Sequence, residues 1–282
     1  MGSGFEHTAL AVFTTLAPMG AGAFIILAYA FIAGRPDEAA VKRLDRWTAL
    51  PLGVLATGFL GAFMHLASPL HAFGVFAGVG SSPLSNEILV GVVFAAAAIL
   101  YWVLALAGKL SDRARKPYLI VLSVLALAFA AFCGLAYMMH TIPTWNTPLS
   151  IVQMVGYALA SGTLLGFCTV GFAKVGLPKG AGAVVATLVA AGVAIGAIGL
   201  GMQIAGLDGI RNIWGPASEL VPDIGAMLGA FVVCGLVAAG IAYASSRKAF
   251  SPALMVGACA IVAVGVFAAR IGFYGLFMGI AL

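Results

Sequence analysis

Residues 87–108 read EILVGVVFAAAAILYWVLALAG, and Glu87 is the only charged residue among them. A helix needs about 20 predominantly apolar residues to cross the hydrocarbon core of a bilayer. The stretch has that length, and its acidic group stands at one end. It therefore predicts a transmembrane helix that begins with a carboxylate.

The same pattern repeats along the whole sequence. Of the 282 residues, 63% are hydrophobic and only 8% are charged, with a mean hydropathy of +1.13, whereas soluble domains carry roughly 25% charged residues. We therefore expect an all-α polytopic integral membrane bundle of eight transmembrane helices, a single transmembrane anchor domain over residues 1–282. Charged and proline-containing segments place the eight spans near residues 8–33, 47–67, 87–108, 118–139, 150–174, 182–205, 223–245 and 253–278.

The basic residues predict the orientation of the bundle. Twelve of the fourteen fall in alternate loops, and of the remaining two only Arg211 lies in the other loops. Cytoplasmic loops are enriched in Lys and Arg, so we expect both termini on the non-cytoplasmic, periplasmic side. The basic, cytoplasmic loops are 34–46, 109–117, 174–181 and 245–252, and the outward loops are 68–86, 140–149 and 206–222.

Other ionisable groups gather at the predicted outer end. Such groups are costly within a membrane and are functional candidates for that reason. Arg270 joins them, because at 1.5 Å per residue it lies roughly 25 Å along a helix that starts at the cytoplasmic side. Two interpretations of Arg270 stay open: contact with a ligand, or an ion pair with one of four acids that locks the bundle. The outer group comprises His65, His71, Glu87, His140, Asp208, Glu219 and Asp223, and its four acids are Glu87, Asp208, Glu219 and Asp223.

His65 and Glu87 are the strongest pair in this group. His65 ends the second span and Glu87 begins the third, so the loop between them brings both to one membrane face. A quinol that loses two electrons also loses two protons; a partly buried carboxylate can accept one, and a histidine can hydrogen-bond a ring oxygen. Simpler interpretations also fit: an acid stabilised by the helix dipole in a first turn, and an ordinary interfacial histidine.

The sequence offers few ligands for a cofactor. Its cysteines stand singly in apolar spans, without the spacing of an iron–sulfur or c-type haem site. His65 and His140 could ligate a haem, but a second pair would need His7 or His71, in terminal or loop positions. We therefore predict no haem, no iron–sulfur cluster and no metal in this protein. Trp145 and Trp214 lie near prolines in outer loops and are predicted as interface anchors.

Short motifs over the whole length carry a family resemblance. In order and spacing, the sequence resembles the membrane anchor subunits of dimethyl sulfoxide reductases, the DmsC family. Family members often have Gly where Ala67 stands and Arg where His71 stands. The matching stretches are MGSG (1–4), HLASPLHAF (65–73), LSNEI (84–88), TIPTW (141–145), LVPD (220–223) and RIGFYGL (270–276).

The resemblance implies a role in anaerobic electron transport at the bacterial inner membrane. Such anchors hold a molybdopterin catalytic subunit and a four-cluster iron–sulfur subunit at the outer face. They oxidise menaquinol as a bound substrate, pass the electrons to the iron–sulfur subunit, and leave the terminal reduction to the catalytic subunit. In the family, the residues matching His65 and Glu87 are associated with the quinol site, and haem is typically absent.

Three alternatives remain. The anchors of polysulfide and nitrite reductases share similar His-Leu-x-x-Pro and Leu-Ser-x-Glu arrangements, so the terminal acceptor is not fixed. A secondary transporter would also be a helical bundle, although transporters place ionisable groups near the bilayer centre on broken helices. A purely structural anchor, without a quinol site, is the third.

Overall fold

The computed structural model describes residues 4–64, 69–245 and 251–279; of Phe5 and of residues 69–73 it gives only the backbone. The expected all-α bundle is confirmed: among the described residues, eight segments are long and apolar enough to cross a membrane. These are Thr8–Gly34, Glu38–Met64, Pro83–Leu106, Asp112–Leu135, Leu149–Phe172, Ala181–Gly209, Ile224–Ser245 and Pro252–Gly275.

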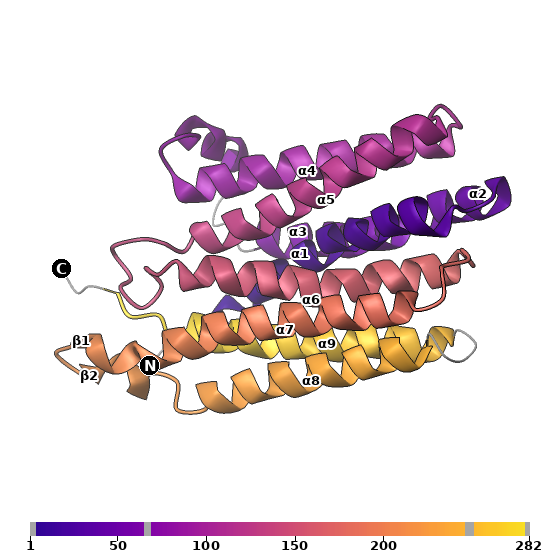
Figure 1. Cartoon of the computed structure of the whole chain (residues 1–282). Coiled ribbons are helices and arrows are strands. Elements are labelled where there is room, and N and C mark those ends of the chain that lie inside the picture. The colour runs from indigo at the N-terminus through magenta and orange to yellow at the C-terminus, as the bar shows by residue number, and fades with distance from the viewer. Residues whose placement is uncertain (1–3, 65–68, 246–250, 280–282) are drawn as a thin grey trace.

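The helices run side by side along one direction (Figure 1). Helices α1 and α6 are the most enclosed, and the others pack around them. The α-helices are α1 (Thr8–Tyr29), α2 (Glu38–Trp47), α3 (Ala49–Met64), α4 (Pro83–Leu106), α5 (Asp112–Leu135), α6 (Leu149–Phe172), α7 (Ala181–Ala205), α8 (Ile224–Ser245) and α9 (Pro252–Gly275). Shorter elements are η1 (Gly4–His7), the π-helical η2 (Ala30–Gly34), η3 (Pro69–Gly78), η4 (Leu207–Gly209), β1 (Arg211–Asn212), β2 (Gly215–Pro216) and η5 (Ala217–Glu219).

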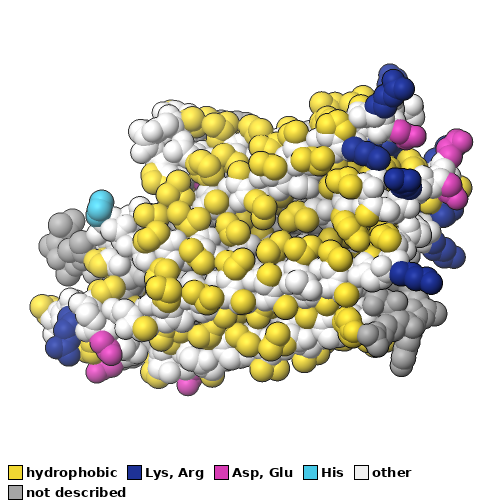
Figure 2. All heavy atoms as spheres, viewed as in Figure 1, with side chains coloured by type: hydrophobic (Ala, Val, Ile, Leu, Met, Phe, Trp, Pro, Cys, Tyr) yellow, Lys and Arg dark blue, Asp and Glu magenta, His cyan; other side chains and the backbone are white. Residues whose placement is uncertain are grey.

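The two ends of the bundle differ. One end, here called the hairpin end, carries η1, η3, the antiparallel β1–β2 pair and both termini (Figure 1). The opposite end, here called the basic end, carries α2 and most of the Lys and Arg side chains visible in this view (Figure 2). Apolar side chains cover the flank between them (Figure 2), and several, such as Val124, Val233 and Val264, are more than half exposed. An apolar belt between two polar ends is the surface expected of a protein that lies in lipid.

Three helix starts lie four or more residues before the expected spans. One of them is the start of α5, which begins at Asp112 instead of residue 118, because the Ser111 side chain accepts a hydrogen bond from the Ala114 N–H and caps the helix. The second membrane segment begins at residue 38, because Asp37 accepts a 2.7 Å hydrogen bond from the Ala40 N–H and caps α2. The third begins at Pro83, where the Ser82 side chain accepts from Ser85 N–H. Glu87 therefore lies beyond the first turn of α4. A helix dipole acts on a charge mainly within that first turn. The interpretation of Glu87 as a first-turn acid was wrong for this reason.

Glycines let the central helices approach one another. A Cβ added at Gly22 of α1 would overlap the carbonyl oxygen of Ala158, and one at Gly162 of α6 would lie 2.5 Å from the Cα of Gly22. Neither could be accommodated without moving the backbone of the neighbouring helix. The α1–α6 crossing therefore depends on small residues, as in many membrane bundles.

A buried ion pair fastens α2 to α5 at the basic end. Arg115 donates to Asp45 through Nη1 at 2.5 Å and Nη2 at 2.9 Å, and the side chains are only 5% and 4% exposed. Trp102 Nε1 of α4 also donates to the Asp45 carbonyl oxygen at 2.9 Å. From the sequence, Arg115 was only an orientation signal in a cytoplasmic loop; the structure shows that it is also a packing element.

Replacing Asp45 with Ala should destabilise the fold by about 3–5 kcal/mol, because Arg115 would stay buried without its partner. Thermal unfolding of the purified protein measures this. Lys42→Ala is the matched control on the same helix, since the Lys42–Glu38 pair is 68% and 83% exposed and should contribute less than about 1 kcal/mol. Equal melting temperatures for Asp45→Ala and Lys42→Ala would contradict the conclusion that the Asp45–Arg115 pair stabilises the fold.

Candidate functional site

Glu87 is a buried acid near the hairpin end of α4. Its side chain is 3% exposed, and the thiol of Cys133 on α5 lies against the carboxyl group. The Oε1 atom has no hydrogen-bond partner among the described residues. A buried oxygen of this kind is costly to leave unsatisfied, so the site suits a ligand that donates a hydrogen bond.

The loop before Glu87 is fixed to the start of α4. Asn86 Oδ1 accepts a 2.7 Å hydrogen bond from the Gly80 N–H, and η3 packs closely there, since a Cβ at Gly78 would lie 2.6 Å from Ser85 Oγ. His65, predicted to pair with Glu87, lies outside the described residues. The pairing therefore stays a prediction.

Arg270 of α9 is completely buried, at 0% exposure. Its Nε donates to Thr14 Oγ1 at 2.9 Å. The guanidinium carbon lies 5.0 Å from the ring centre of Tyr137, 4.2 Å from that of Phe273 and 4.6 Å from that of Tyr274. Cation–π contacts with three rings stabilise a charge that is buried away from bulk solvent, which explains how an arginine can lie inside an apolar bundle.

Neither open interpretation of Arg270 fits its geometry fully. Within the described part of the protein no carboxylate forms a salt bridge with it, and the acids Asp208, Glu219 and Asp223 are exposed. Glu87 is the acid that interacts with Arg270 electrostatically, without direct contact. The structure thus places two buried members of the predicted group, Glu87 and Arg270, near each other and leaves His140, Asp208, Glu219 and Asp223 at the surface.

Tyrosine hydroxyls surround Arg270. Tyr137 and Tyr274 share a hydrogen bond in which either can donate, and Tyr274 also lies 3.3 Å from Thr14 Oγ1. Tyr157 of α6 is 1% exposed and interacts electrostatically with Arg270. Sequence reasoning missed these tyrosines. The available signal was Tyr274 itself, which follows Arg270 by four residues and so lies on the same helix face.

The loop between α5 and α6 closes the hairpin end over this cluster. Trp145 is 5% exposed, stacks on Phe273 and donates from Nε1 to the Phe273 carbonyl oxygen at 2.9 Å. Thr144 Oγ1 donates to the Leu276 carbonyl oxygen at 2.5 Å. The prediction of Trp145 as an interface anchor was wrong, because its indole is part of the interior. Trp214 is 86% exposed, and its assignment as an interface anchor stays a prediction.

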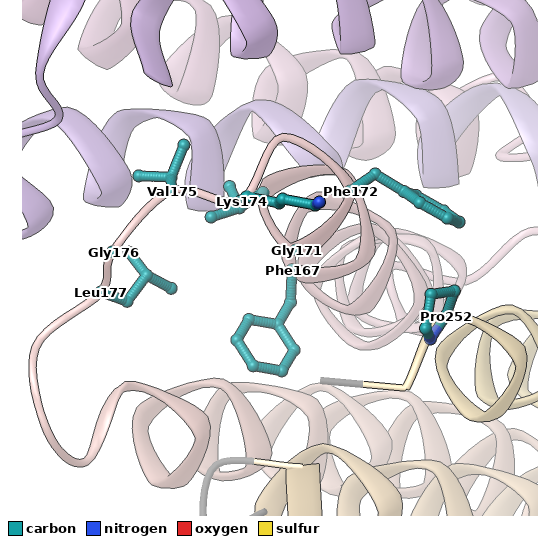
Figure 3. Close-up of a pocket in the computed structure, with 9 residues that line it drawn as sticks. Phe167, Gly171, Phe172, Lys174, Val175, Gly176, Leu177 and Pro252 are labelled. Atoms are coloured by element: carbon teal, nitrogen blue, oxygen red, sulfur yellow. The ribbon is translucent and has the colours of Figure 1, made fainter. Parts of the chain in front are cut away.

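Among the side chains that the structure describes, the remaining sequence candidates do not join this cluster; those of His65 and His71 lie outside the described part. His140 is exposed and makes a 3.1 Å contact with Asn146. Among the described residues, no three His, Cys, Asp or Glu side chains converge as metal ligands. A separate apolar pocket lies at the basic end, where Phe167 projects from α6 and Lys174, Leu177 and Pro252 contribute to the wall (Figure 3). None of the predicted site residues lines that pocket.

Comparison with known proteins assigns the family. The family model described as DMSO reductase anchor subunit (DmsC) matches residues 1–276. The protein belongs to the DmsC family. The match includes every membrane segment together with Glu87 and Arg270, and it confirms the resemblance drawn from the short motifs.

Individual DmsC relatives are similar over different lengths. The protein is 33% identical over 294 positions to the C subunit of the anaerobic dimethyl sulfoxide reductase of Escherichia coli (strain K12), covering 100% of this protein and 99% of the relative. It is 30% identical over 290 positions to the anaerobic dimethyl sulfoxide reductase subunit YnfH of the same organism, with the same coverage. The C subunit of the Haemophilus influenzae enzyme is 30% identical over 150 positions, 53% of each protein.

Proposed function

We propose that this DmsC-family anchor binds and oxidises menaquinol and passes the electrons to an iron–sulfur partner subunit of a DMSO-reductase-type molybdenum oxidoreductase. Family membership supports the role of a multi-pass inner-membrane anchor of a molybdoenzyme complex. The single observation that carries the quinol step is the buried Oε1 of Glu87, which has no hydrogen-bond partner among the described residues. It is an acceptor placed within a membrane segment.

The chemistry of the site fits a quinol hydroxyl. Glu87 accepts the hydroxyl hydrogen bond at Oε1 and then the proton, while the electrons leave to the partner's iron–sulfur cluster. His65, at the end of the second membrane segment, is proposed to orient a ring oxygen of the substrate. Arg270 is enclosed by three aromatic rings and by Thr14. It therefore does not contact the substrate, and it acts through its electrostatic interaction with Glu87. The buried Trp145 loop excludes bulk water from this side.

The partner subunits are proposed to dock at the hairpin end. This end carries both termini and the β1–β2 pair (Figure 1), and it is the end that the positive-inside rule assigns to the periplasm. Glu87 lies at the same end, which keeps the path for electrons to a docked partner short. Ile213 and Trp214, 85% and 86% exposed, project from the hairpin and offer apolar surface to a partner or to the membrane interface.

Glu87→Gln should lower quinol-dependent turnover of the assembled complex by roughly 100-fold or more, because the amide cannot take up the proton. His65→Ala should do the same. Reduction of the terminal acceptor by a soluble redox dye, which bypasses the anchor, should stay unchanged. Glu219→Gln, an exposed acid of the same end, is the matched control and should keep wild-type turnover.

Two results would contradict this assignment. Wild-type quinol oxidation by Glu87→Gln would remove the acid from the mechanism. Loss of membrane attachment with unchanged quinol affinity would show that Glu87 and His65 are docking residues instead.

The proposed orientation places the hairpin end in the periplasm. Alkaline phosphatase, which is active only outside the cytoplasm, should be active when fused after residue 282, and a green fluorescent protein fused there should be dark. Fusions truncated within loop 109–117 should give the reverse pattern, because the basic loops are retained in the cytoplasm. The opposite result at both positions would contradict this orientation and would mean that the Glu87 site lies at the cytoplasmic face.

A further inference from the structure

Several polar atoms near Arg270 are buried without a protein partner. Nη1 and Nη2 of Arg270 and the hydroxyl of Tyr157 have no hydrogen-bond partner among the described residues, and neither does Glu87 Oε1. A buried polar group left unsatisfied is costly, and a charged one more so. Native proteins usually satisfy such groups with internal water, which needs two to four polar partners. Glu87 and Tyr157 both interact electrostatically with Arg270, so the donors of Arg270 and the oxygens of Tyr157 and Glu87 are candidates for these partners.

The hydroxyls beside these atoms can pass a proton. Tyr137 and Tyr274 share a hydrogen bond in which either oxygen can donate, and the same holds between Tyr274 and Thr14 at 3.3 Å. A hydroxyl both donates and accepts, so a series of hydroxyls and waters can reverse its direction after each transfer. An arginine cannot do this, because it has no acceptor and does not lose its proton.

The cluster extends from Glu87 toward the surface of the hairpin end. Glu87 and Cys133 lie on α4 and α5, and Tyr274 lies on α9 against His7 of η1, with ring centres 5.6 Å apart. His7 is half-buried, and η1 is packed on α9 so closely that a Cβ at Gly4 would overlap the Ile271 carbonyl oxygen. Tyr274, one member of the hydroxyl pair, therefore contacts η1 at the hairpin end.

We propose that the Tyr137, Tyr157 and Tyr274 hydroxyls, with water held by the Arg270 guanidinium, form the route by which the proton taken up by Glu87 leaves toward the hairpin end. This inference rests on the proposed quinol oxidation. The O–H bond of the quinol breaks, an O–H bond forms on Glu87, and the electrons go to the iron–sulfur partner. The carboxyl group then gives its proton to the bridging water, and the second quinol proton follows the same way.

Arg270 has a separate part in this route. Its permanent charge attracts the carboxylate that remains once the proton has left Glu87, and its Nη1 and Nη2 groups, which have no partner among the described residues, fix the oxygen atoms of the water. We therefore describe Arg270 as a positioning residue. The tyrosines that enclose it also keep it away from the substrate.

The test compares Tyr157→Phe and Tyr274→Phe in the membrane-bound complex with a quinol substrate. Each should lower turnover roughly tenfold, as expected when one step of an acid–base series is removed, with KM within about twofold of wild type. The solvent deuterium isotope effect on turnover should increase, because proton transfer becomes rate-limiting. Tyr157→Phe removes no hydrogen bond to a described residue, so it should fold normally even if Tyr274→Phe does not.

Tyr101→Phe is the matched control. Tyr101 is also a fully buried tyrosine beside an arginine, Arg115, but it lies with the Asp45 ion pair at the basic end. Its removal should leave quinol turnover and the isotope effect unchanged. A similar loss in Tyr101→Phe would mean that any buried tyrosine affects turnover through packing, and would overturn the relay.

The outcomes separate the relay from the quinol site itself. If Glu87→Gln is inactive and both Tyr157→Phe and Tyr274→Phe keep wild-type turnover and isotope effect, the relay is wrong and the quinol site stands. A raised KM at unchanged turnover would show that the tyrosines bind substrate, which also overturns the relay. If Glu87→Gln oxidises quinol normally, the proposed function itself fails.

Discussion

A guanidinium group cannot lose its charge in a protein, and Arg270 is therefore a permanent cation inside an apolar bundle. The structure accommodates it with one hydrogen bond, from Nε to Thr14, and with the faces of Tyr137, Phe273 and Tyr274. Thr14 lies on α1, Tyr137 follows the end of α5, and the other two rings lie on α9, so the position of Arg270 ties three helices together. The α5–α6 loop, the N-terminal η1 and the end of α9 then cover the cluster from outside.

Arg115 is also buried, but its charge is paired in a way that the charge of Arg270 is not. Arg115 at the basic end is paired bidentately with Asp45, an arrangement that satisfies both charges and fixes α2 to α5. Arg270 has no such carboxylate among the described residues, and Glu87 interacts with it only at a distance. One end of the bundle therefore holds a neutralised pair that serves packing, and the other holds a cation and an acid that form no such pair among the described residues, where we propose that Glu87 takes up the quinol proton.

Much of the fold could be predicted from the sequence because its signal is local. Apolar runs of membrane length, interrupted by charges, predicted eight spans with ends within a few residues of the observed ones for most helices. Short capping signals were missed, so α2 and the true starts of α4 and α5 were not expected. In the site, the burial of Glu87 and Arg270 followed from the cost of charge in a membrane. The Tyr137–Tyr274 contact and the burial of Trp145 could not be predicted, because they depend on how α5, α9 and a loop pack in three dimensions.

Proton uptake from quinol by Glu87 is the step on which the proposed mechanism depends. Infrared difference spectroscopy of the membrane-bound complex, recorded between quinol-reduced and oxidised states, measures protonation of carboxyl groups directly. We expect a carboxylic-acid C=O band that changes on quinol oxidation in the wild type and is absent in Glu87→Gln. Persistence of the same band in Glu87→Gln would mean that another acid accepts the proton, and would contradict the mechanism.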